Sequence, residues 1–361
     1  MRFRLAVLSV AFALVLPAQP RTQLADHIVW DRSFPEMSNS AVSSAVVDTQ
    51  GVLWLSIAGR IVRIDASGKF LGTTELLDNA LPGGPEGYES DEMLAATPDG
   101  TVGLLITYFT AANDRALAAR FTRLNRDGSA AGFTQVAGPD RWTFAFAGMR
   151  DNQFLMLAKS KRLSAIRFGA AGNAVWEHEL ASKPDAVAAV SLDGGASCIA
   201  QSTDGARGVM LKLDASGAEL NRATALMGSS IALAPNPDGG CTLLHYARPK
   251  SGEVQQCLLT AFDSKLQRQW SSPVPFRSPA GGPQIGLARV KDGYVVIGRA
   301  QRPTGHGFFL AQYDFNGKLL WTNFDGARSW ARFVLPLQDG YYLVGAPDVM
   351  RDTGLHVIRA K

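Results

Sequence analysis

The chain has 361 residues, of which 46% are hydrophobic and 19% charged, with 36 Gly, 18 Pro and 3 Cys. The charged share lies below the roughly one quarter that is typical of soluble domains, while the apolar share is ordinary. This composition excludes a disordered chain, a coiled coil and a small disulfide-stapled protein. The length allows two domains or one large all-β domain.

The first residues have the pattern of a secretory signal peptide. A basic start with Arg2 and Arg4 precedes an apolar stretch from Leu5 to Leu16, and Pro17-Ala18 then supplies a helix breaker and a small residue. The apolar stretch is shorter than the roughly 20 residues of a membrane span. We therefore expect residues 1–18 to be removed on export, which places the mature chain in the periplasm or outside the cell.

The charge of the chain carries little information about its partners. Removal of the signal peptide lowers the formal net charge from +4 to +2, because two arginines leave with it. Basic residues are scattered, without the basic and aromatic stripe that nucleic-acid-binding proteins present. No later segment is long and apolar enough to span a bilayer. We expect no nucleic-acid partner, no integral membrane segment and a monomer.

A repeat of about 42 to 54 residues organises the rest of the chain, a length typical of propeller blades. In each unit an apolar stretch runs into a turn that carries Asp, usually with Gly. These residues tolerate the positive φ of tight turns, so the pattern indicates a hairpin. The seven turns are Asp48-Thr49-Gln50-Gly51, Asp99-Gly100, Asp151-Asn152, Asp193-Gly194-Gly195, Asp238-Gly239-Gly240, Asp292-Gly293 and Asp339-Gly340.

A second turn follows in most units and has the pattern Asp-x-x-Gly. Trp176, Trp270 and Trp321 come shortly after it, at the same place in their units. Each unit therefore predicts four antiparallel strands, A to D, with the first turn between A and B and the second between C and D. The copies of the second turn are residues 65–68, 125–128, 214–217 and 314–317, with degenerate copies at 169–172 and 263–266.

The two ends of the chain predict how the ring closes. The seventh unit has strands A, B and C, of which the last is Gly354 to Ala360, and then the chain stops. The segment from His27 to Asp31 carries Trp30 where other D strands carry Trp. We therefore predict an all-β, seven-bladed β-propeller over residues 19–361, made of four-stranded antiparallel blades, the last one closed by the N-terminal strand.

Two units resemble the repeats of bacterial quinoprotein-like (PQQ-like) β-propellers: Tyr313-Asp314-Phe315-Asn316-Gly317-Lys318-Leu319-Leu320-Trp321 and Ile64-Asp65-Ala66-Ser67-Gly68-Lys69. In that family the turn and the Trp hold neighbouring blades together, so the resemblance implies a fold rather than an activity. Quinone-dependent members usually have eight blades, a vicinal cysteine pair and an acidic calcium-binding set. This chain has seven units and no adjacent Cys. We therefore carry over no quinone chemistry and expect no cofactor.

Three Cys in an exported chain leave at least one unpaired within the monomer. Cys241 and Cys257 fall on neighbouring predicted strands, roughly opposite each other. They could form a disulfide or could be two buried thiols. Cys198 lies in an apolar run and is expected in the core.

The long connections are the expected place for a site. The A–B and C–D turns lie at one end of the strands, and the B–C and D–A connections lie at the other. Variable loops on a rigid scaffold usually carry function. We therefore expect any site around the mouth of the central channel on the second face. The long connections there are residues 72–92, 107–115, 248–252, 278–283 and 302–307.

Four carboxylates stand where the first long connection enters the next strand A: Glu86, Glu89, Asp91 and Glu92. Closely spaced carboxylates could supply oxygen ligands to Ca²⁺. The spacing of a calcium-binding Asp-x-Asp-x-Asp-Gly loop is missing, so a solvated loop is the alternative.

Arg141-Trp142 and Arg328-Ser329-Trp330 occupy equivalent places before strand A in their blades. An Arg beside an aromatic ring could bind an anionic or sugar-like ligand by charge and stacking. The alternative is that Trp142 and Trp330 pack between blades, with the stems of Arg141 and Arg328 covering them.

His245, Tyr246 and His306 stand near the B–C connections of neighbouring blades, with Arg302 close by. Such a set at a channel mouth could transfer protons in a lyase or hydrolase, and ordinary surface residues are the alternative. No spacing marks a metal triad, and the Gly-x-Ser-x-Gly nucleophile motif is missing.

Two functions from different classes fit this sequence. The first is an exported binding or scaffold module, whose long-loop face binds a protein, peptide or glycan of the envelope or the cell exterior. The second is a small-substrate lyase or hydrolase with its site at the channel mouth.

Overall fold

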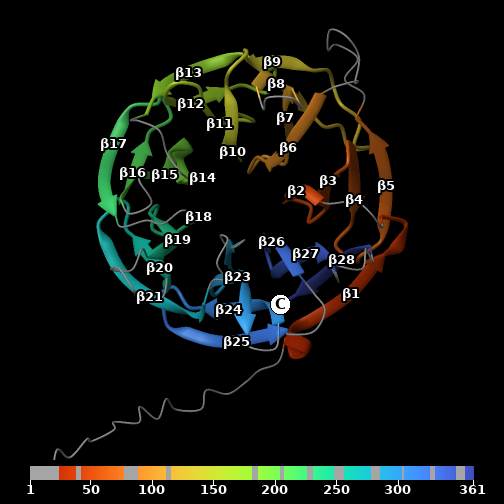
Figure 1. Ribbon diagram of the computed structural model, residues 1–361, viewed down its shortest axis with the longest axis vertical. Helices are drawn as coiled ribbons and strands as arrows, with labels where there is room; N and C mark the ends of the chain where they lie inside the picture. The colour runs from red at the N-terminus through yellow and green to blue at the C-terminus, as the bar shows by residue number, and fades with distance from the viewer. Residues whose placement is uncertain are drawn as a thin grey trace, which may run out of the picture.

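Seven four-stranded antiparallel sheets form a ring in the computed structural model (Figure 1). The predicted seven-bladed β-propeller is therefore confirmed. The predicted signal peptide, residues 1–18, lies outside the described residues. The structure describes residues 24–37, 42–76, 88–110, 115–180, 186–203, 207–225, 231–247, 256–277, 285–302, 305–325, 330–346 and 354–361.

The first three blades each use four consecutive strands, running from the channel to the rim. The first consists of β2 (Val42–Val47), β3 (Leu53–Ile57), β4 (Arg60–Ile64) and β5 (Phe70–Glu75). The second consists of β6 (Tyr88–Ala96), β7 (Val102–Thr110), β8 (Arg115–Arg123) and β9 (Thr134–Ala137). The third consists of β10 (Trp142–Gly148), β11 (Phe154–Lys159), β12 (Leu163–Phe168) and β13 (Ala174–Glu179).

The next three blades repeat this order. The fourth consists of β14 (Ala186–Ser191), β15 (Ser197–Thr203), β16 (Arg207–Leu213) and β17 (Glu219–Ala225), with the 3-10 helix η3 (Asp193–Gly195) in its first turn. The fifth consists of β18 (Ile231–Pro235), β19 (Cys241–Ala247), β20 (Gln256–Phe262) and β21 (Arg268–Arg277). The sixth consists of β22 (Ile285–Val290), β23 (Gly293–Arg302), β24 (Gly305–Tyr313) and β25 (Leu319–Asp325).

The seventh blade joins the two ends of the chain. Its strands are β26 (Trp330–Leu337), β27 (Gly340–Ala346), β28 (Leu355–Ala360) and β1 (Ile28–Phe34), and β1 stands between the 3-10 helices η1 (Leu24–His27) and η2 (Pro35–Met37). β1 is antiparallel to β28, with Trp30 opposite Arg359 and Phe34 opposite Leu355. In Figure 1 the two strands lie side by side at the rim. This confirms the predicted closure by the N-terminal strand.

The core consists of clusters between blades, because each sheet is covered on both faces. The middle strand β3 is buried at every residue, while no residue of the outer strand β5 is fully buried. A continuously apolar strand is what a doubly covered sheet requires. One cluster joins Leu55 and Val62 of the first blade to Tyr342 and Val344 of the seventh.

Four of the C–D turns are built around the carboxylate of their first residue. The Oδ1 atom of Asp65 accepts hydrogen bonds from the backbone N–H groups of Ser67 and Lys69, at 2.9 Å each, and Gly68 adopts a φ of 79°. The Ser67 hydroxyl also donates to this carboxylate and is the main cause that lowers the pKa of Asp65. Asp214, Asp263 and Asp314 make the same backbone contacts in their blades.

Each such turn also binds the preceding blade. The indole N–H groups of Trp30, Trp176 and Trp270 donate at 3.0 Å to the second carbonyl of the following blade's C–D turn. Those carbonyls belong to Ala66, Ala215 and Phe315. The repeated Trp and the repeated turn are therefore two halves of one contact between blades.

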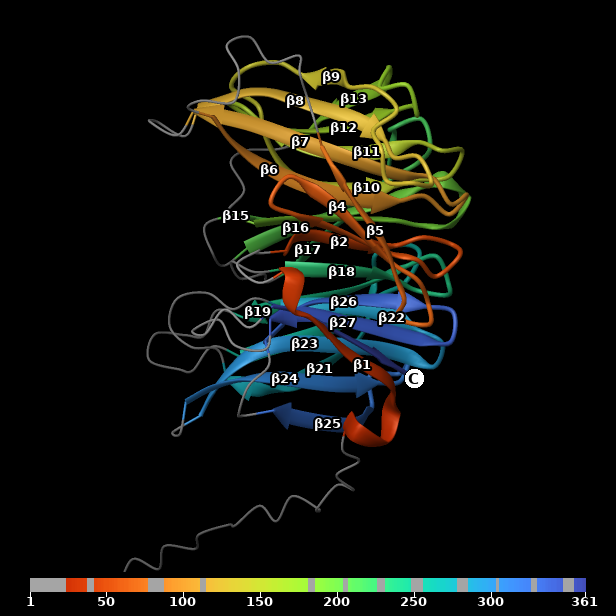
Figure 2. The same ribbon diagram turned by 90° about the vertical axis from the view of Figure 1, so that its right-hand side faces the viewer.

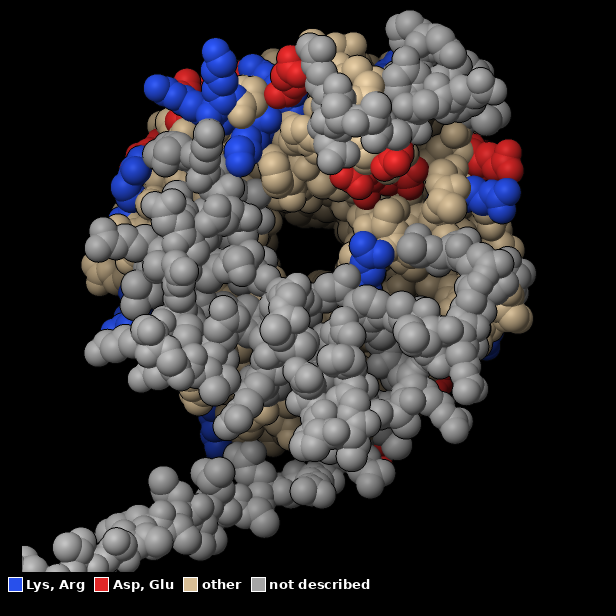
Figure 3. Space-filling view, in the orientation of Figure 1, with Lys and Arg blue, Asp and Glu red and all other residues tan. Residues whose placement is uncertain are grey.

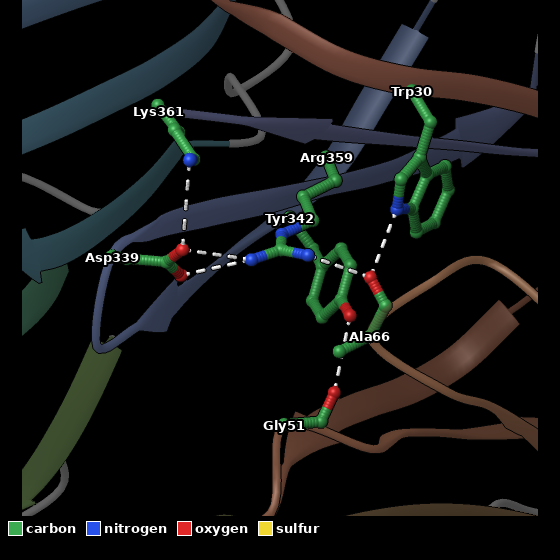
Figure 4. A network of polar contacts seen from close by, with 7 residues as sticks. All are labelled: Trp30, Gly51, Ala66, Asp339, Tyr342, Arg359 and Lys361. Atoms are coloured by element: carbon green, nitrogen blue, oxygen red, sulfur yellow. Dashed lines mark hydrogen bonds and ion pairs between the residues drawn. The ribbon is translucent and has the colours of Figure 1, made fainter.

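A cation at the second-last residue of strand C supports the same contact. Arg359 donates to the Ala66 carbonyl at 2.7 Å and is held by the Asp339 carboxylate (Figure 4). Trp30 donates to the same carbonyl, and Tyr342 donates to that of Gly51. These contacts fasten the seventh blade to the first, where the ring closes. The corresponding cations of other blades that donate to the next blade are Arg63, Arg167 and Lys212.

The sixth blade faces a different partner, because the C and D strands of the seventh come from opposite ends of the chain. Trp321 stacks on His27, with ring centroids 4.9 Å apart and planes 9° apart. Its indole donates to Gln312 at 2.7 Å instead of to a turn carbonyl. The backbone N–H of Lys361 donates to the His27 carbonyl at 2.9 Å. The two termini thus take the place of the missing turn.

Arg167→Met is expected to destabilise the ring by about 3 kcal/mol, measured by urea unfolding. Arg167 is 2% exposed and donates to the carbonyls of Gly195 at 3.0 Å and Ala215 at 2.9 Å. Burial lowers the pKa of Arg167, and these carbonyls are what the buried charge binds. Methionine fills the space but leaves the Gly195 carbonyl without this donor. Arg123 is the exposed counterpart in the second blade, so Arg123→Met should change stability by less than about 0.5 kcal/mol. Equal effects of the two substitutions would contradict this role.

Candidate functional site

A polar cluster at the channel mouth connects three blades. We call Ser43, Ser56, Glu92 and Arg332 the mouth cluster. The Glu92 carboxylate accepts a hydrogen bond from Ser43 at 3.3 Å and another from Ser56. Arg332 donates to the carbonyl of Val42, the residue before Ser43. The cluster therefore runs from β26 of the seventh blade across β2 and β3 to β6 of the second.

The sequence places these side chains at the mouth because they stand on the innermost strands or at the loop end of strand B. Ser43, Glu92 and Arg332 belong to strands A, and Ser56 is the second-last residue of β3. Figure 3 shows the face that carries the B–C and D–A connections, with a hollow at its centre. Acidic side chains gather beside this hollow, over β6.

Glu92 is a buried carboxylate held by hydroxyl groups. It is 8% exposed, and among the described residues no cation forms an ion pair with it. A buried charge is costly unless hydrogen bonds compensate it, and the two serines supply them. Partial burial lowers the pKa of Arg332, which stays charged. The cluster therefore presents one negative and one positive group on the border of the channel.

The predicted acidic group is divided by the pleat of its strand. Glu89, Asp91 and Glu92 all lie within β6, and Glu86 lies outside the described residues. Successive side chains of a strand point to opposite faces, so Glu92 points away from the side of Glu89 and Asp91. Glu89 and Asp91 are exposed. In the described part of the chain no group of three or more His, Cys, Asp or Glu residues could hold a metal ion.

Arg141 and Trp142 contact different elements. Arg141 forms an ion pair with Glu177 at 3.1 Å. The Trp142 ring packs on Phe109 of the second blade, with centroids 5.0 Å apart. The two side chains do not form a joint clamp. Of the equivalent pair, Arg328 lies outside the described residues, and Trp330 begins β26 with its side chain not described.

His245 lies inside its blade rather than on an open surface. It is 4% exposed, and its Nε2 is 3.3 Å from the Thr260 hydroxyl, which is 2.9 Å from that of Ser271. This row of contacts crosses from β19 to β21 and leads toward the rim. Tyr246 follows in β19, Arg302 ends β23 and His306 stands in β24. The side chains of these last three are not described.

Sequence reasoning missed Ser43, Ser56 and Arg332 as site residues. A charged residue on an innermost strand otherwise made of small and apolar residues was the available signal for Arg332. The two serines had no such signal, because their role comes from a carboxylate on the next blade.

No family model and no curated protein matches this chain. Solved structures do match it. The Dos1 propeller has a TM-score of 0.57 and 10% identity, over 89% of this chain and 78% of that one. The Dos1 propeller and this chain share the β-propeller fold. The Pan2 WD40 domain of Neurospora crassa has a TM-score of 0.55 and 11% identity, over 92% of this chain and 94% of that one. BBS1N, in complex with ARL6DN, has a TM-score of 0.55 and 9% identity, over 93% and 96%.

At these identities the likeness shows the fold alone. Within the residues that the structure describes, no helix is long and apolar enough to cross a membrane.

Proposed function

We propose that this chain is a binding scaffold that recognises a protein or peptide partner through the face carrying the B–C and D–A connections. The observation that carries the proposal is the difference between the two faces of the ring, which Figure 2 shows from the side. On the turn face, carbonyls such as those of Ala66 and Ala215 are bound by the neighbouring blade. On the other face, the mouth cluster and the exposed carboxylates of Glu89 and Asp91 border the channel.

A partner with basic groups fits the acidic side of the mouth best. Glu89 and Asp91 are exposed on one face of β6, and the buried Glu92 of the mouth cluster follows them on the opposite face. Electrostatic complementarity across an interface raises the rate of association and selects the partner. The fold supports a protein partner, because BBS1N, which shares it, is found in complex with ARL6DN.

We also propose that the chain is exported and meets this partner in the periplasm or outside the cell. The support is the signal-peptide pattern of residues 1–18. The resemblance to bacterial quinoprotein-like repeats agrees with such a location. The intact mass of the protein purified from the envelope should correspond to a chain that begins at Gln19. A mass that still includes residues 1–18 would contradict export.

Charge reversal on the two faces tests the binding surface. The immobilised mature protein should capture its partner from an envelope extract, and Glu89→Lys with Asp91→Lys should lower the captured amount at least about tenfold. Both carboxylates are exposed to solvent, so the double variant should melt like the wild type. Lys265→Glu reverses a charge in an exposed C–D turn on the opposite face and should leave capture unchanged. Capture of every partner by the double variant would refute the proposed face, and a captured glycan would refute a protein partner.

The described residues favour no enzymatic function. Of the two histidines considered for an enzymatic site, His245 is buried within its blade and contacts Thr260, and the side chain of His306 is not described. We therefore propose the binding function alone.

A further inference from the structure

Two cysteines from neighbouring blades meet in the core between the fourth and fifth blades. Cys198 stands on β15 and Cys241 on β19, and their Sγ atoms are 2.9 Å apart. Both side chains are fully buried. The separation exceeds the length of a disulfide bond, about 2.0 Å, by less than about 1 Å.

The backbone holds both cysteines in place. Each is the first or second residue of a strand B that follows a tight A–B turn, and each is paired on its other side with strand C. Cys198 lies opposite Lys212, and Cys241 lies opposite Phe262. The two sulfur atoms therefore face each other across the gap between two sheets. Disulfides between packed sheets are also found in immunoglobulin domains, so this placement suits a bond.

The third cysteine is not available to either of them. Cys257 lies opposite Tyr246, whereas Cys241 lies opposite Phe262. Five residues of strand separate these positions, which is about 17 Å. The expectation that Cys241 and Cys257 stand roughly opposite each other is therefore wrong. Their strands are neighbours, but the register separates them.

We propose that Cys198 and Cys241 form a disulfide that links the fourth and fifth blades and leaves Cys257 as the single thiol. The oxidant is a disulfide donor, such as glutathione disulfide or the oxidised dithiol of a thiol–disulfide oxidoreductase. It accepts the two electrons that the cysteines lose. One cysteine thiolate attacks the donor and forms a mixed disulfide, releasing the donor's first sulfur as a thiol. The thiolate of the second cysteine then attacks the sulfur of the first cysteine in this mixed disulfide, and the donor's second sulfur leaves as a thiol. Two thiols lose two protons and two electrons, and the donor gains them.

The bond forms before the two blades close on each other. In the folded ring neither sulfur is open to a donor, since both side chains are fully buried. The hydrogen bond with Cys198, and then burial, raise the pKa of the Cys241 thiol, which suppresses the reactive thiolate after folding. The two cysteines are 43 residues apart in the chain, so the bond closes a long loop and restricts the unfolded state.

Counting thiols tests the disulfide directly. The mature full chain is refolded with a mixture of reduced glutathione and glutathione disulfide, unfolded in guanidinium, and alkylated before or after reduction. We expect one alkylated cysteine per chain before reduction and three after it. Peptide mapping should find a crosslink between the peptides of Cys198 and Cys241. Three alkylated cysteines without reduction, or a crosslink that includes Cys257, would overturn the proposal.

Matched variants separate the pair from the third cysteine. Cys257→Ser should show no alkylation before reduction, and Cys198→Ser should show two. Reductant should lower the melting temperature of the wild type and of Cys257→Ser by about 5 °C. If Cys198→Ser fails to fold, the number of alkylated cysteines in the wild type and in Cys257→Ser still tests the disulfide. This disulfide does not depend on the binding face, so each proposal can fail alone.

Discussion

Deletion of residues 27–33 is expected to unfold the whole ring rather than to loosen one blade. The deletion removes strand D of the seventh blade and leaves β28 as an open edge, which would be prone to pair with other chains. It also removes the side chains that bind the first blade, since Trp30 donates to Ala66 and Arg32 donates to Gly68 at 2.7 Å. The contact of His27 with Trp321 of the sixth blade is lost as well. Three blades are affected, so the expected loss is more than about 5 kcal/mol, comparable to the whole stability of a typical protein.

Thermal unfolding followed by circular dichroism checks this result. The full-length protein should give one cooperative transition, and the truncated protein should give none above room temperature. A synthetic peptide of residues 24–37, added in excess during refolding, should restore part of the transition by adding the missing strand. A truncated protein that melts like the full-length one would show that β1 does not hold the ring together.

Gly293→Ala is expected to destabilise the protein by more than about 4 kcal/mol, one of the largest effects available from a single methyl group. Gly293 has a φ of 151°, and a Cβ added there would lie 1.8 Å from the Tyr313 carbonyl oxygen and 2.8 Å from the Asp314 Cα. Both neighbours are backbone atoms, one at the end of the adjacent strand C and one in the turn that follows it, and they cannot move without breaking the sheet. Val at this position should be worse still.

Gly239→Ala is the matched control for this clash. Gly239 stands in the A–B turn of the fifth blade at a φ of 77°, and a Cβ there would meet nothing within 4 Å. The substitution should therefore cost only the left-handed backbone penalty, about 1 to 2 kcal/mol. Urea unfolding of both variants gives the comparison. Similar losses for Gly293→Ala and Gly239→Ala would mean that the close approach to Tyr313 does not limit this position.

The reason why position 293 requires glycine differs from the one that the sequence suggests. The Asp-Gly pattern suggests that both residues form the centre of a tight turn. In the structure Val290 pairs with Gly293, so the turn residues are Lys291 and Asp292, and Gly293 begins β23. Gly340 has the same place in the seventh blade, with a Cβ position 2.0 Å from the Ala360 carbonyl oxygen. The glycine is needed because strand C passes close by, which a local pattern does not reveal.

Strand positions were more predictable than strand lengths. In the sixth unit the apolar pattern predicts strand A from Ile285 to Val290, and the structure has these bounds. The same pattern predicts strand B from Tyr294 to Gly298, whereas the strand in the structure continues to Arg302. Hydrophobic patterns mark the apolar part of a strand, whereas the backbone pairing of the β23–β24 hairpin continues to Arg302 and Gly305. The prediction therefore ended where the apolar run of the sequence ends.

The candidate site was the least predictable part. The sequence located the acidic residues, but it did not bring Glu92 to Ser43 and Ser56. Glu92 and Ser43 stand on different blades, and their contact depends on how two sheets pack. No periodicity within one blade contains that information.

By itself the sequence determined the repeat, the order of the strands and the closure of the ring. These features follow from local rules: turns need Asp and Gly, doubly covered strands need apolar residues, and a unit lacking one strand needs that strand from elsewhere. The tertiary structure alone decided which side chains meet between blades. Cys241 contacts Cys198 and not Cys257. Arg167 donates hydrogen bonds to the turns of the next blade, and Glu92 accepts hydrogen bonds from hydroxyl groups of the neighbouring blade. Such contacts depend on the distance and register between sheets, which are set by the packing of the whole ring.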